Sequence, residues 1–435
     1  MNNHSKKVKK TLISLIKAMS ANPELHVKNP GKDFTRNRKL PFEAVVKLLI
    51  TMGGNSIYKE LLESQGYDLN TSTTSAFVQQ REKILPSAFE YLFQKFTATQ
   101  SKHRKYRGYR LLAADGSDLH SPTNPDDTDT YFQSHQDAKG YNLTHLNALY
   151  DLYNRIYVDA ITEPRRCENE CRALSNMVDR SAIGGKVIVV ADRGYENYNV
   201  FAHIEQKGWN YVIRVKDLSS NGILSGLPLP YDDEFDVCVR RILTRKQTKE
   251  VKECPDVYRF MPQNQVFDFL PLQTKETYPI SFRVVRIKIA DDSYETILTN
   301  LDTRRFPPNE LKEIYRMRWG VETSFRELKY SVGLTNFHAK KQEYIVQEIF
   351  ARLIMYNFSE MIISHIVISQ ADTKHAYQVN FTVAIHICRR FLRSNAPPPD
   401  VEALIRKNVL PVREGRSDIR KIYYKSSVSF VYRVA

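Results

Sequence analysis

Apolar side chains recur at three- and four-residue spacing along the N-terminal quarter of the chain, and this period is typical of amphipathic helices. The predicted helices are Thr11–Ser20, Pro41–Met52, Ile57–Gln65, Thr74–Ile84 and Ser87–Gln100. Pro41 stands at a position where proline favours the start of a helix. Residues 1–105 are therefore predicted to be helical.

Short, nearly continuous apolar runs follow, and these are typical of strands buried on both faces of a sheet. The clearest is Lys186–Ala191, in which four consecutive β-branched residues precede Asp192 and a glycine turn. Leu111–Ala114 likewise stops at Asp115 and a glycine, so we expect both aspartates at the edge of a sheet. Asp192 could instead cap the following helix. The other predicted elements are strands at Leu146–Leu152, Arg155–Ile161 and Asn210–Lys216 and helices at Glu168–Ile183 and Tyr195–Gly208.

Residues 217–299 differ in character, because short β-rich runs follow one another without a convincing helix. These runs are Asp236–Leu243, Val257–Met261, Val266–Leu272, Ile280–Ile289 and Tyr294–Leu298. Charged residues alternate with apolar ones at Arg283, Arg286 and Lys288, and they could follow a DNA backbone or form the wet face of the module.

Glu310–Leu334 is predicted to form one helix with an unusual polar stripe. At 100° per residue, Tyr315, Arg318, Glu322 and Lys329 fall within about 60° of arc. A phenol, a guanidinium, a carboxylate and an ammonium on one stripe suit a polyanion or a metal better than a core. The alternative is a solvated face joined by ion pairs at i to i+4 spacing. Two more helices are predicted at Glu343–Gln370 and Val379–Ser394, before Pro397–Pro399 interrupt the chain.

Positive charge gathers at both ends of the chain. Residues 1–40 carry ten Lys/Arg against two Asp/Glu, and residues 381–435 carry eleven against four, whereas the formal net charge is +15. The middle is therefore neutral. This distribution of charge suggests that the terminal regions bind phosphate groups and that the binding weakens as the salt concentration rises. Arg36, Arg38 and Lys39 are candidate DNA-binding residues, although a solvated basic loop is the alternative.

The tail at Arg413–Arg433 interleaves basic residues with aromatic ones, which suits phosphate contact or, equally, core packing. The aromatic residues are Tyr423, Tyr424, Phe430 and Tyr432.

The composition is that of a soluble globular protein large enough for two or three domains, with 435 residues, 42% hydrophobic and 26% charged. The first apolar run carries Lys17, and Glu348–Ser369 carries four ionisable residues, so neither a secretory signal nor a membrane span is expected. Cys167 and Cys171 lack a second Cys or His pair at zinc spacing. We therefore predict reduced thiols in a cytoplasmic protein.

The stripe on the Glu310–Leu334 helix has a specific spacing, with two, three and six residues between its members. This Y-R-E-K spacing resembles the signature of bacterial DDE transposases of the insertion-sequence-four family. Asp115-Gly-Ser and Asp192-Arg-Gly-Tyr resemble the other two motifs of that family, in the correct order. The resemblance covers the chain from Asp115 to about Lys341 and is weaker at both ends.

The resemblance implies an α/β fold, a ribonuclease H-like catalytic core interrupted by an all-β insertion and flanked by helical terminal regions. The implied catalytic domain comprises residues 106–216 and 300–395, with the insertion at 217–299. Residues 1–105 would form a helical DNA-binding domain, and residues 396–435 a basic C-terminal tail.

The resemblance also implies a catalytic triad of Asp115, Asp192 and Glu322. Three converging carboxylates repel one another unless a cation joins them, and oxygen ligands favour Mg²⁺ or Mn²⁺. In the family the first aspartate bridges two metal ions, while the second aspartate and the glutamate hold one each. Asp115, Asp192 and Glu322 are therefore the expected metal ligands.

Tyr315, Arg318 and Lys329 would then bind the phosphates beside the cleaved bond. The family resemblance further implies a homodimer on double-stranded transposon ends and second-strand cleavage through a DNA hairpin, with a flipped base held by an aromatic side chain. Trp319 is a candidate for this stacking, whereas Trp209 could be core and an aromatic residue of the insertion could serve instead.

The predicted function is metal-dependent cut-and-paste transposition of an insertion sequence at the bacterial nucleoid. A transposase-derived DNA-binding protein without catalysis is the alternative from another class, and a metal nuclease of the same fold is a third. His135 and His145 lie between the first two aspartate motifs without metal-ligand spacing, and we expect structural roles for both.

Overall fold

The computed structural model describes residues 4–100, 102–133, 135, 138–218, 222–290, 293–366, 368, 376–394 and 400–412. The predicted break at Pro397–Pro399 and the tail from Arg413 with its aromatic residues lie outside these residues.

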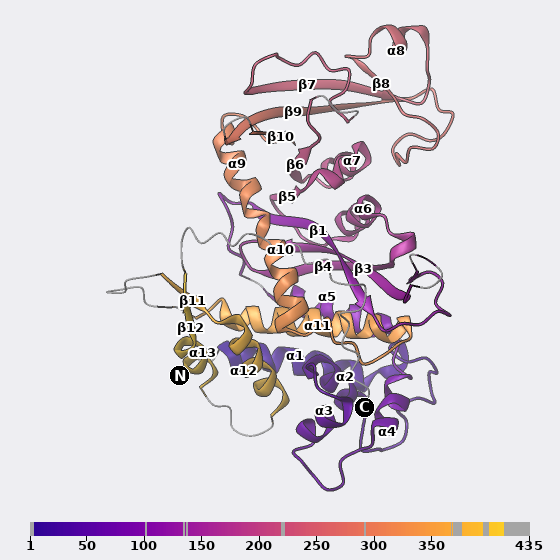
Figure 1. Cartoon of the computed structure of the whole chain (residues 1–435), viewed down its shortest axis with the longest axis vertical. Helices are drawn as coiled ribbons and strands as arrows, with labels where there is room; N and C mark the ends of the chain where they lie inside the picture. The colour runs from indigo at the N-terminus through magenta and orange to yellow at the C-terminus, as the bar shows by residue number, and fades with distance from the viewer. Residues whose placement is uncertain are drawn as a thin grey trace.

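Helices make up both ends of the described chain, and strands dominate its middle (Figure 1). The N-terminal helices are α1 (His4–Ala21), α2 (Phe42–Thr51), α3 (Ile57–Ser64), α4 (Thr74–Arg81) and α5 (Pro86–Ala98), so the five predicted helices are confirmed. The later ones are α6 (Glu170–Arg180), α7 (Tyr198–Gln206), α8 (Lys249–Glu253), α9 (Pro308–Met317), α10 (Trp319–Arg326), α11 (Gln342–Ile363), α12 (Phe381–Arg393) and α13 (Val401–Lys407). Short 3₁₀ turns occur at η1 (Pro23–Leu25), η2 (Arg165–Cys167) and η3 (Arg193–Tyr195), and η4 (Glu327–Ser331) is a π-helical turn.

One large mixed sheet organises the molecule. Its strands are β1 (Arg110–Ser121), β2 (Tyr131–Phe132), β3 (Tyr141–Asp151), β4 (Ile156–Pro164), β5 (Val187–Ala191), β6 (Asn210–Val215), β7 (Phe235–Thr244), β8 (Tyr258–Phe260), β9 (Thr277–Ala290) and β10 (Ser293–Thr299). They lie in the order β4-β3-β1-β5-β6-β10-β9-β7-β8, with β2 also paired to β3. A separate small ribbon joins β11 (Tyr377–Val379) to β12 (Val409–Pro411).

The first five strands of that order correspond to the strands predicted between residues 106 and 216. β3 is antiparallel to both β4 and β1, whereas β1, β5 and β6 are mutually parallel. Helices α6 and α7 cover one face of these strands, and α9, α10 and α11 pack against the other. The mixed α/β fold class is therefore confirmed.

The β-rich region does not form a sheet of its own. β10 pairs with β6 along the edge of the core, and β9, β7 and β8 extend the same sheet outward (Figure 1). The predicted strand at Val266–Leu272 is wrong, because these residues form turns, and the helix at Lys249–Glu253 was not predicted. Sequence periodicity identified the strands but could not identify the edge with which they pair.

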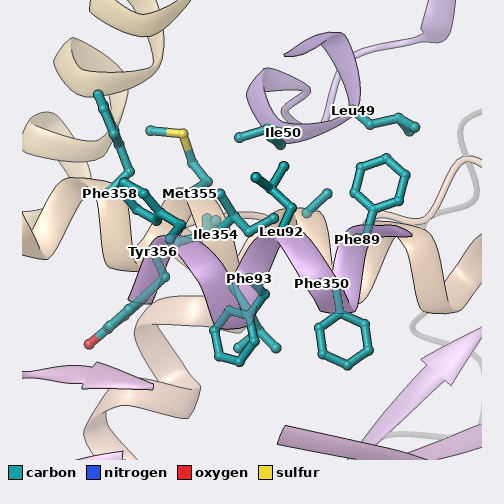
Figure 2. Packing of buried hydrophobic residues seen from close by; sticks show 14 of the residues in the cluster. Leu49, Ile50, Phe89, Leu92, Phe93, Phe350, Ile354, Met355, Tyr356 and Phe358 are labelled. Carbon is teal, nitrogen blue, oxygen red and sulfur yellow. The ribbon is translucent and has the colours of Figure 1, made fainter. Parts of the chain in front are cut away.

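The N-terminal helices share a core with the catalytic part of the chain, so the predicted boundary at residue 105 does not divide the core. Helix α11 crosses the molecule between the sheet and helices α1–α4 (Figure 1). Figure 2 shows aromatic and aliphatic side chains of α2, α5 and α11 in contact around it. The ring centroids of Phe93 and Phe350 lie 5.8 Å apart. Burial on nearly all sides explains why α11 lacks a polar stripe.

Candidate active site

Asp115 projects from the middle of β1 toward α10. Leu111 and Ala113, on the same face of the strand, pack in the clusters that contain side chains of α9 and α10. The prediction that Gly116 ends this strand is wrong, because pairing with β3 carries β1 on to Ser121 after its parallel partner β5 has ended. Asp115 therefore lies where the parallel part of the sheet ends.

Asp192 directly follows β5 and is half-buried. Its Oδ1 accepts a hydrogen bond from the backbone N–H of Gly194 at 2.8 Å, which caps the short turn η3. The alternative role as the cap of the next helix does not apply, because Asn197 caps α7. The end of the parallel strand thus holds the Asp192 carboxylate beside the sheet edge that carries Asp115.

The helix predicted at Glu310–Leu334 is interrupted twice. At Arg318 the backbone bonds change to three-residue spacing, from Arg318 N to Tyr315 O and from Val321 N to Arg318 O, each 3.0 Å. Farther on, Val332 N donates to Glu327 O across the π-helical turn η4. Such turns are frequent at functional sites because they re-aim side chains without ending the helix.

The interruption at Arg318 aims its guanidinium at two carboxylates. Arg318 Nη2 lies 2.7 Å from Glu322 Oε1, and Nη1 lies 3.9 Å from Asp115 Oδ2. The guanidinium also lies over the rings of Tyr315 and Trp319, at 5.8 and 5.5 Å from their centroids. Arg318 therefore joins the strand residue Asp115 to the helix residue Glu322.

Asp115 is electrostatically coupled to the other two acidic residues. Burial, with smaller contributions from the negative charges of Asp192 and Glu322, raises the pKa of Asp115 to about 6 against the opposing effect of Arg318. The raised pKa means that the site disfavours the ionised form of Asp115. A cation bound among the three carboxylates would stabilise that form.

The donor set of Asp115, Asp192 and Glu322 consists of oxygen atoms alone, which fits a hard divalent cation. Among the described residues, the group whose ligand atoms all lie within 4.8 Å of one another is a different one, Asp118, His145 and Glu168. The ligand atoms of the three acidic residues are spaced more widely than those of this group.

Two other members of the stripe lie deeper than expected. Tyr315 is only 6% exposed and packs in the cluster below β5 and β6, while its hydroxyl interacts with Arg214. Lys329 Nζ donates to the backbone oxygen of Asp118 at 2.9 Å. Burial lowers the pKa of Lys329 against the attraction of Asp118 and Asp115. Lys329 thus holds β1 against the end of the signature helix.

Of the remaining residues considered for base stacking and DNA binding, some lie on the surface and one lies in the core. Trp319 is 58% exposed on α10, next to Arg318, whereas Trp209 is buried in the core, as its alternative interpretation predicted. Arg36, Arg38 and Lys39 are exposed in the loop before α2, and Lys39 Nζ donates to Asn70 O.

Two arginine residues of the β-rich region form ion pairs within the protein. Arg283 is buried and paired with Asp236 at 2.6 Å, and Arg286 lies 3.5 Å from Asp217. Arg283 therefore belongs to the core of this region and not to a DNA-facing surface.

Sequence reasoning missed the chemistry around His145, which was expected to be structural. His145 contacts Asp118, Glu168 and Glu170, all on the face of β1 opposite Asp115. Asp118 and His145 come together only because of the register in which β1 pairs with β3. That register cannot be predicted from the separation of the two residues in the sequence. Cys171 lies near by, with Sγ 3.4 Å from Gly194 O, and Cys167 is exposed.

Comparison with known proteins identifies the family. The transposase DDE domain model matches residues 106–358, which is more than half of the chain. The chain belongs to the DDE transposases. It is 22% identical over 393 residues to the transposase InsG of insertion sequence element IS4 from Escherichia coli K12, covering 85% of this chain and 81% of InsG. A putative transposase of the same strain, InsZ, is 24% identical over 185 residues, or 40% of this chain and 61% of InsZ.

Among solved structures, this DDE transposase is similar to the piggyBac transposase in its synaptic complex with hairpin DNA. The identity is 11% and the TM-score 0.44, over 96% of this chain and 87% of the piggyBac chain.

The family confirms the resemblance found in the sequence and shows that this DDE transposase is an enzyme of phosphodiester cleavage and strand transfer. Divalent metal ions are general cofactors of the family, and transposon DNA is its substrate. Among the described residues, no helix combines the length and the apolar character that crossing a membrane requires.

Proposed function

We propose that this protein carries out cut-and-paste transposition of an insertion sequence, with Asp115, Asp192 and Glu322 as its catalytic carboxylates. The observation that carries the proposal is that Arg318 contacts Asp115 of β1 and Glu322 of α10, while Asp192 at the end of β5 acts with Glu322 to raise the pKa of Asp115. No structural role requires acidic residues from three elements to share one sheet edge.

The proposed cofactor is a pair of Mg²⁺ ions, for which Mn²⁺ can substitute. Asp115, Asp192 and Glu322 would together hold these ions. When bound, two such ions activate a water or a 3′-hydroxyl and stabilise the leaving oxygen of an in-line displacement. Asp192 keeps its orientation through the Gly194 N–H bond.

Arg318 and Lys329 would orient the DNA phosphates. The planar fork of Arg318 suits phosphate oxygens, and exchanging its bond with Glu322 for a phosphate would release that carboxylate for metal binding. Tyr315 supports Arg318 from below, since its ring is buried beneath the guanidinium. Lys329 holds β1 through Asp118 and extends positive charge toward the site.

Second-strand cleavage through a DNA hairpin is the proposed route, with Trp319 holding the flipped base. Its ring is largely exposed and adjoins Arg318, so a base stacked on it would lie within reach of the carboxylates. Stacking of this kind is worth about 1–3 kcal/mol per base.

The helical N-terminal part, with Arg36, Arg38 and Lys39, would bind the transposon ends. We further propose a homodimer that holds two ends together in the bacterial cytoplasm, where its chromosomal target lies. Exposure of the three basic side chains supports the DNA contact.

The test is cleavage of DNA that carries the element's own ends, comparing wild type with Glu322→Gln. We expect Glu322→Gln to bind the ends with unchanged affinity and to cut at least a thousandfold more slowly. Glu313→Gln is the matched control, because Glu313 lies one turn before the site, is exposed and pairs only with Arg316 among the described contacts.

The products of the cleavage reaction distinguish the proposed transposase from a nuclease and from a non-catalytic DNA-binding protein. Joined strands and hairpin ends support the transposase, whereas nicks without joining would indicate a nuclease. Binding without cleavage by the wild type in Mg²⁺ and in Mn²⁺ would favour the non-catalytic DNA-binding protein and contradict the proposal.

A further inference from the structure

A second group of ionisable side chains lies on the face of β1 opposite the catalytic carboxylates. Asp118 is three residues after Asp115, and an odd spacing along a strand places side chains on opposite faces. His145 on β3 is paired with Asp118 in register, and Glu168 lies between η2 and α6. One ligand atom from each of Asp118, His145 and Glu168 lies within 4.8 Å of the others.

Two carboxylates converge on a single nitrogen of His145. The Nδ1 atom is 2.6 Å from Asp118 Oδ1 and 2.9 Å from Glu168 Oε2. Because one ring nitrogen carries at most one proton, it can donate to only one of them. Glu168 Oε2 is indeed a buried oxygen without a hydrogen-bond partner. The His145 side chain is 6% exposed, so water does not readily take the place of the missing donor.

Arg165 neutralises the outer oxygens of the same two carboxylates. Its Nε lies 3.1 Å from Asp118 Oδ2, and it is paired with Glu168 Oε1. The inner oxygens, Asp118 Oδ1 and Glu168 Oε2, therefore stay directed at His145 Nδ1. On the other side of the ring, Nε2 lies 3.1 Å from Glu170 Oε1 but makes no hydrogen bond. A carboxylate behind the second ring nitrogen is the usual partner of a metal-binding histidine.

His203 shows how a histidine between carboxylates is satisfied without a metal. Its Nδ1 lies 3.0 Å from Asp179 Oδ1, and its Nε2 lies 2.9 Å from Asp268 Oδ2. Each ring nitrogen has a single carboxylate oxygen as its hydrogen-bond partner. His145 differs because two carboxylate oxygens lie at one nitrogen, whereas the other nitrogen is buried without a hydrogen-bond partner.

Gly116 provides the space for this arrangement. A Cβ atom at this position would lie 2.3 Å from His145 Nε2 and 2.4 Å from Glu170 Oε1. The glycine of the Asp-Gly-Ser motif therefore lets the imidazole and Glu170 lie directly against the backbone of β1.

We propose that Asp118, His145 and Glu168 bind a divalent transition-metal ion of the Zn²⁺ class, separate from the catalytic ions. Zn–N and Zn–O bonds are about 2.0–2.2 Å long, so the donors around one ion stand roughly 3 Å apart or slightly more. The inner oxygens and Nδ1 reach that spacing with small movements. A mixed imidazole and carboxylate set favours Zn²⁺ over Mg²⁺. The bound ion would join β1, β3 and the start of α6 behind Asp115.

The test is Zn²⁺ binding by the full chain in a background of Asp115→Asn with Glu322→Gln, which removes two of the three proposed catalytic ligands. Titration calorimetry should give one Zn²⁺ per chain, and Co²⁺ should give a visible absorption band that Zn²⁺ abolishes. His145→Gln should lose both signals. His203→Gln is the matched control, because it replaces a histidine that also contacts two carboxylates, and it should keep both.

The proposal is overturned if the background protein binds no Zn²⁺, or if His145→Gln binds it as tightly. If circular dichroism shows that His145→Gln does not fold, Glu168→Gln gives the answer, and stoichiometric binding by that variant also overturns the proposal. DNA cleavage by the wild type is measured separately. Cleavage with no Zn²⁺ site would overturn this inference alone, and a Zn²⁺ site without cleavage would overturn only the proposed function.

Discussion

The guanidinium of Arg318 lies 3.9 Å from the carboxylate of Asp115, across the gap between α10 and β1. The same guanidinium bonds Glu322 at 2.7 Å, so one cation holds a strand residue and a helix residue at a common point. Asp115 nevertheless has a raised pKa, because burial and two neighbouring carboxylates outweigh Arg318. Ionisation of a carboxyl group with a raised pKa costs folding stability, which is consistent with the proposed catalytic role of Asp115.

Asp115→Asn should stabilise the metal-free protein at neutral pH. The pKa of Asp115 rises from 3.8 to about 6 on folding, so the folded state binds the extra proton between these values. Stability contributed by Asp115 therefore falls as pH rises through that window. In the presence of a chelator, we expect the free energy of unfolding of the variant to exceed that of the wild type by up to about 3 kcal/mol at pH 7 and to equal it near pH 4.

Thermal unfolding across this pH range measures the difference between the two proteins. Asp126→Asn is the control, because Asp126 is exposed in the loop after β1. An Asp115→Asn variant no more stable than wild type at pH 7 would contradict the raised pKa.

Arg318→Gln should slow DNA cleavage and shift its pH dependence upward. Loss of the guanidinium removes the main attraction that lowers the pKa of Asp115, so a higher pH is needed to ionise the carboxylate. Loss of a charged hydrogen bond to phosphate should also cost about 1.5–3 kcal/mol, or roughly tenfold or more in rate. The measurement is the pH–rate profile, with the exposed Arg326→Gln on the same helix as control. An unshifted profile would show that Arg318 does not act on Asp115.

Trp319→Ala should weaken binding to hairpin ends more than binding to uncut duplex ends. The exposed ring can stack on an extruded base, and its loss should cost about 1–3 kcal/mol. Fluorescence of 2-aminopurine at the terminal base reports extrusion directly. Tyr330→Ala, which removes an exposed aromatic ring of η4, is the control. Equal losses on hairpin and duplex ends would assign the stacking role to another residue.

The sequence was sufficient to predict the core strands and the signature residues because their patterns are local. The apolar run before Asp192 and the stripe on the signature helix each lie within one element, where periodicity is informative. The same logic failed at Gly116, because the end of β1 is determined by the length of β3, which pairs with it. A local pattern contains no information about the length of a partner strand.

Features that depend on contacts between distant elements could not be predicted. The β-rich region was expected to be an insertion, and its junction with β6 along β10 depends on pairing between strands far apart in the chain. The burial of Tyr315 and the convergence of carboxylates on His145 likewise depend on how helices and strands pack. The interruption at Arg318 is a further such feature, and helix propensity does not encode it.

Arg81→Met should destabilise the protein by about 3–5 kcal/mol, because it leaves a buried charge without its main partner. Arg81 on α4 bonds Glu348 on α11 at 2.8 Å, and both side chains are almost fully buried. Burial would raise the pKa of Glu348, but Arg81 and His338 hold it at about 2. The stability that this carboxylate contributes is present above pH 4.5 and is lost as pH falls toward 2.

Chemical denaturation at pH 7 and at pH 3 measures this effect, and the penalty for Arg81→Met should shrink at the lower pH. Lys59→Met, at an exposed position of α3, is the control. A penalty below 1 kcal/mol at pH 7 would show that the pair does not hold the N-terminal helices to α11.

Gly116→Ala should damage the protein through His145, although the new methyl group points away from the catalytic carboxylates. The added Cβ would lie 2.3 Å from a buried ring and 2.4 Å from Glu170, so the ring must move. Overpacking of this kind costs about 1–3 kcal/mol. Gly184→Ala is the matched control, because no atom lies within 4 Å of its Cβ position. We expect Gly116→Ala, unlike the control, to unfold at a lower temperature and to shift the His145 NMR resonances. Unchanged resonances would show that β1 yields instead of the ring, and Asp115 would then be the residue displaced.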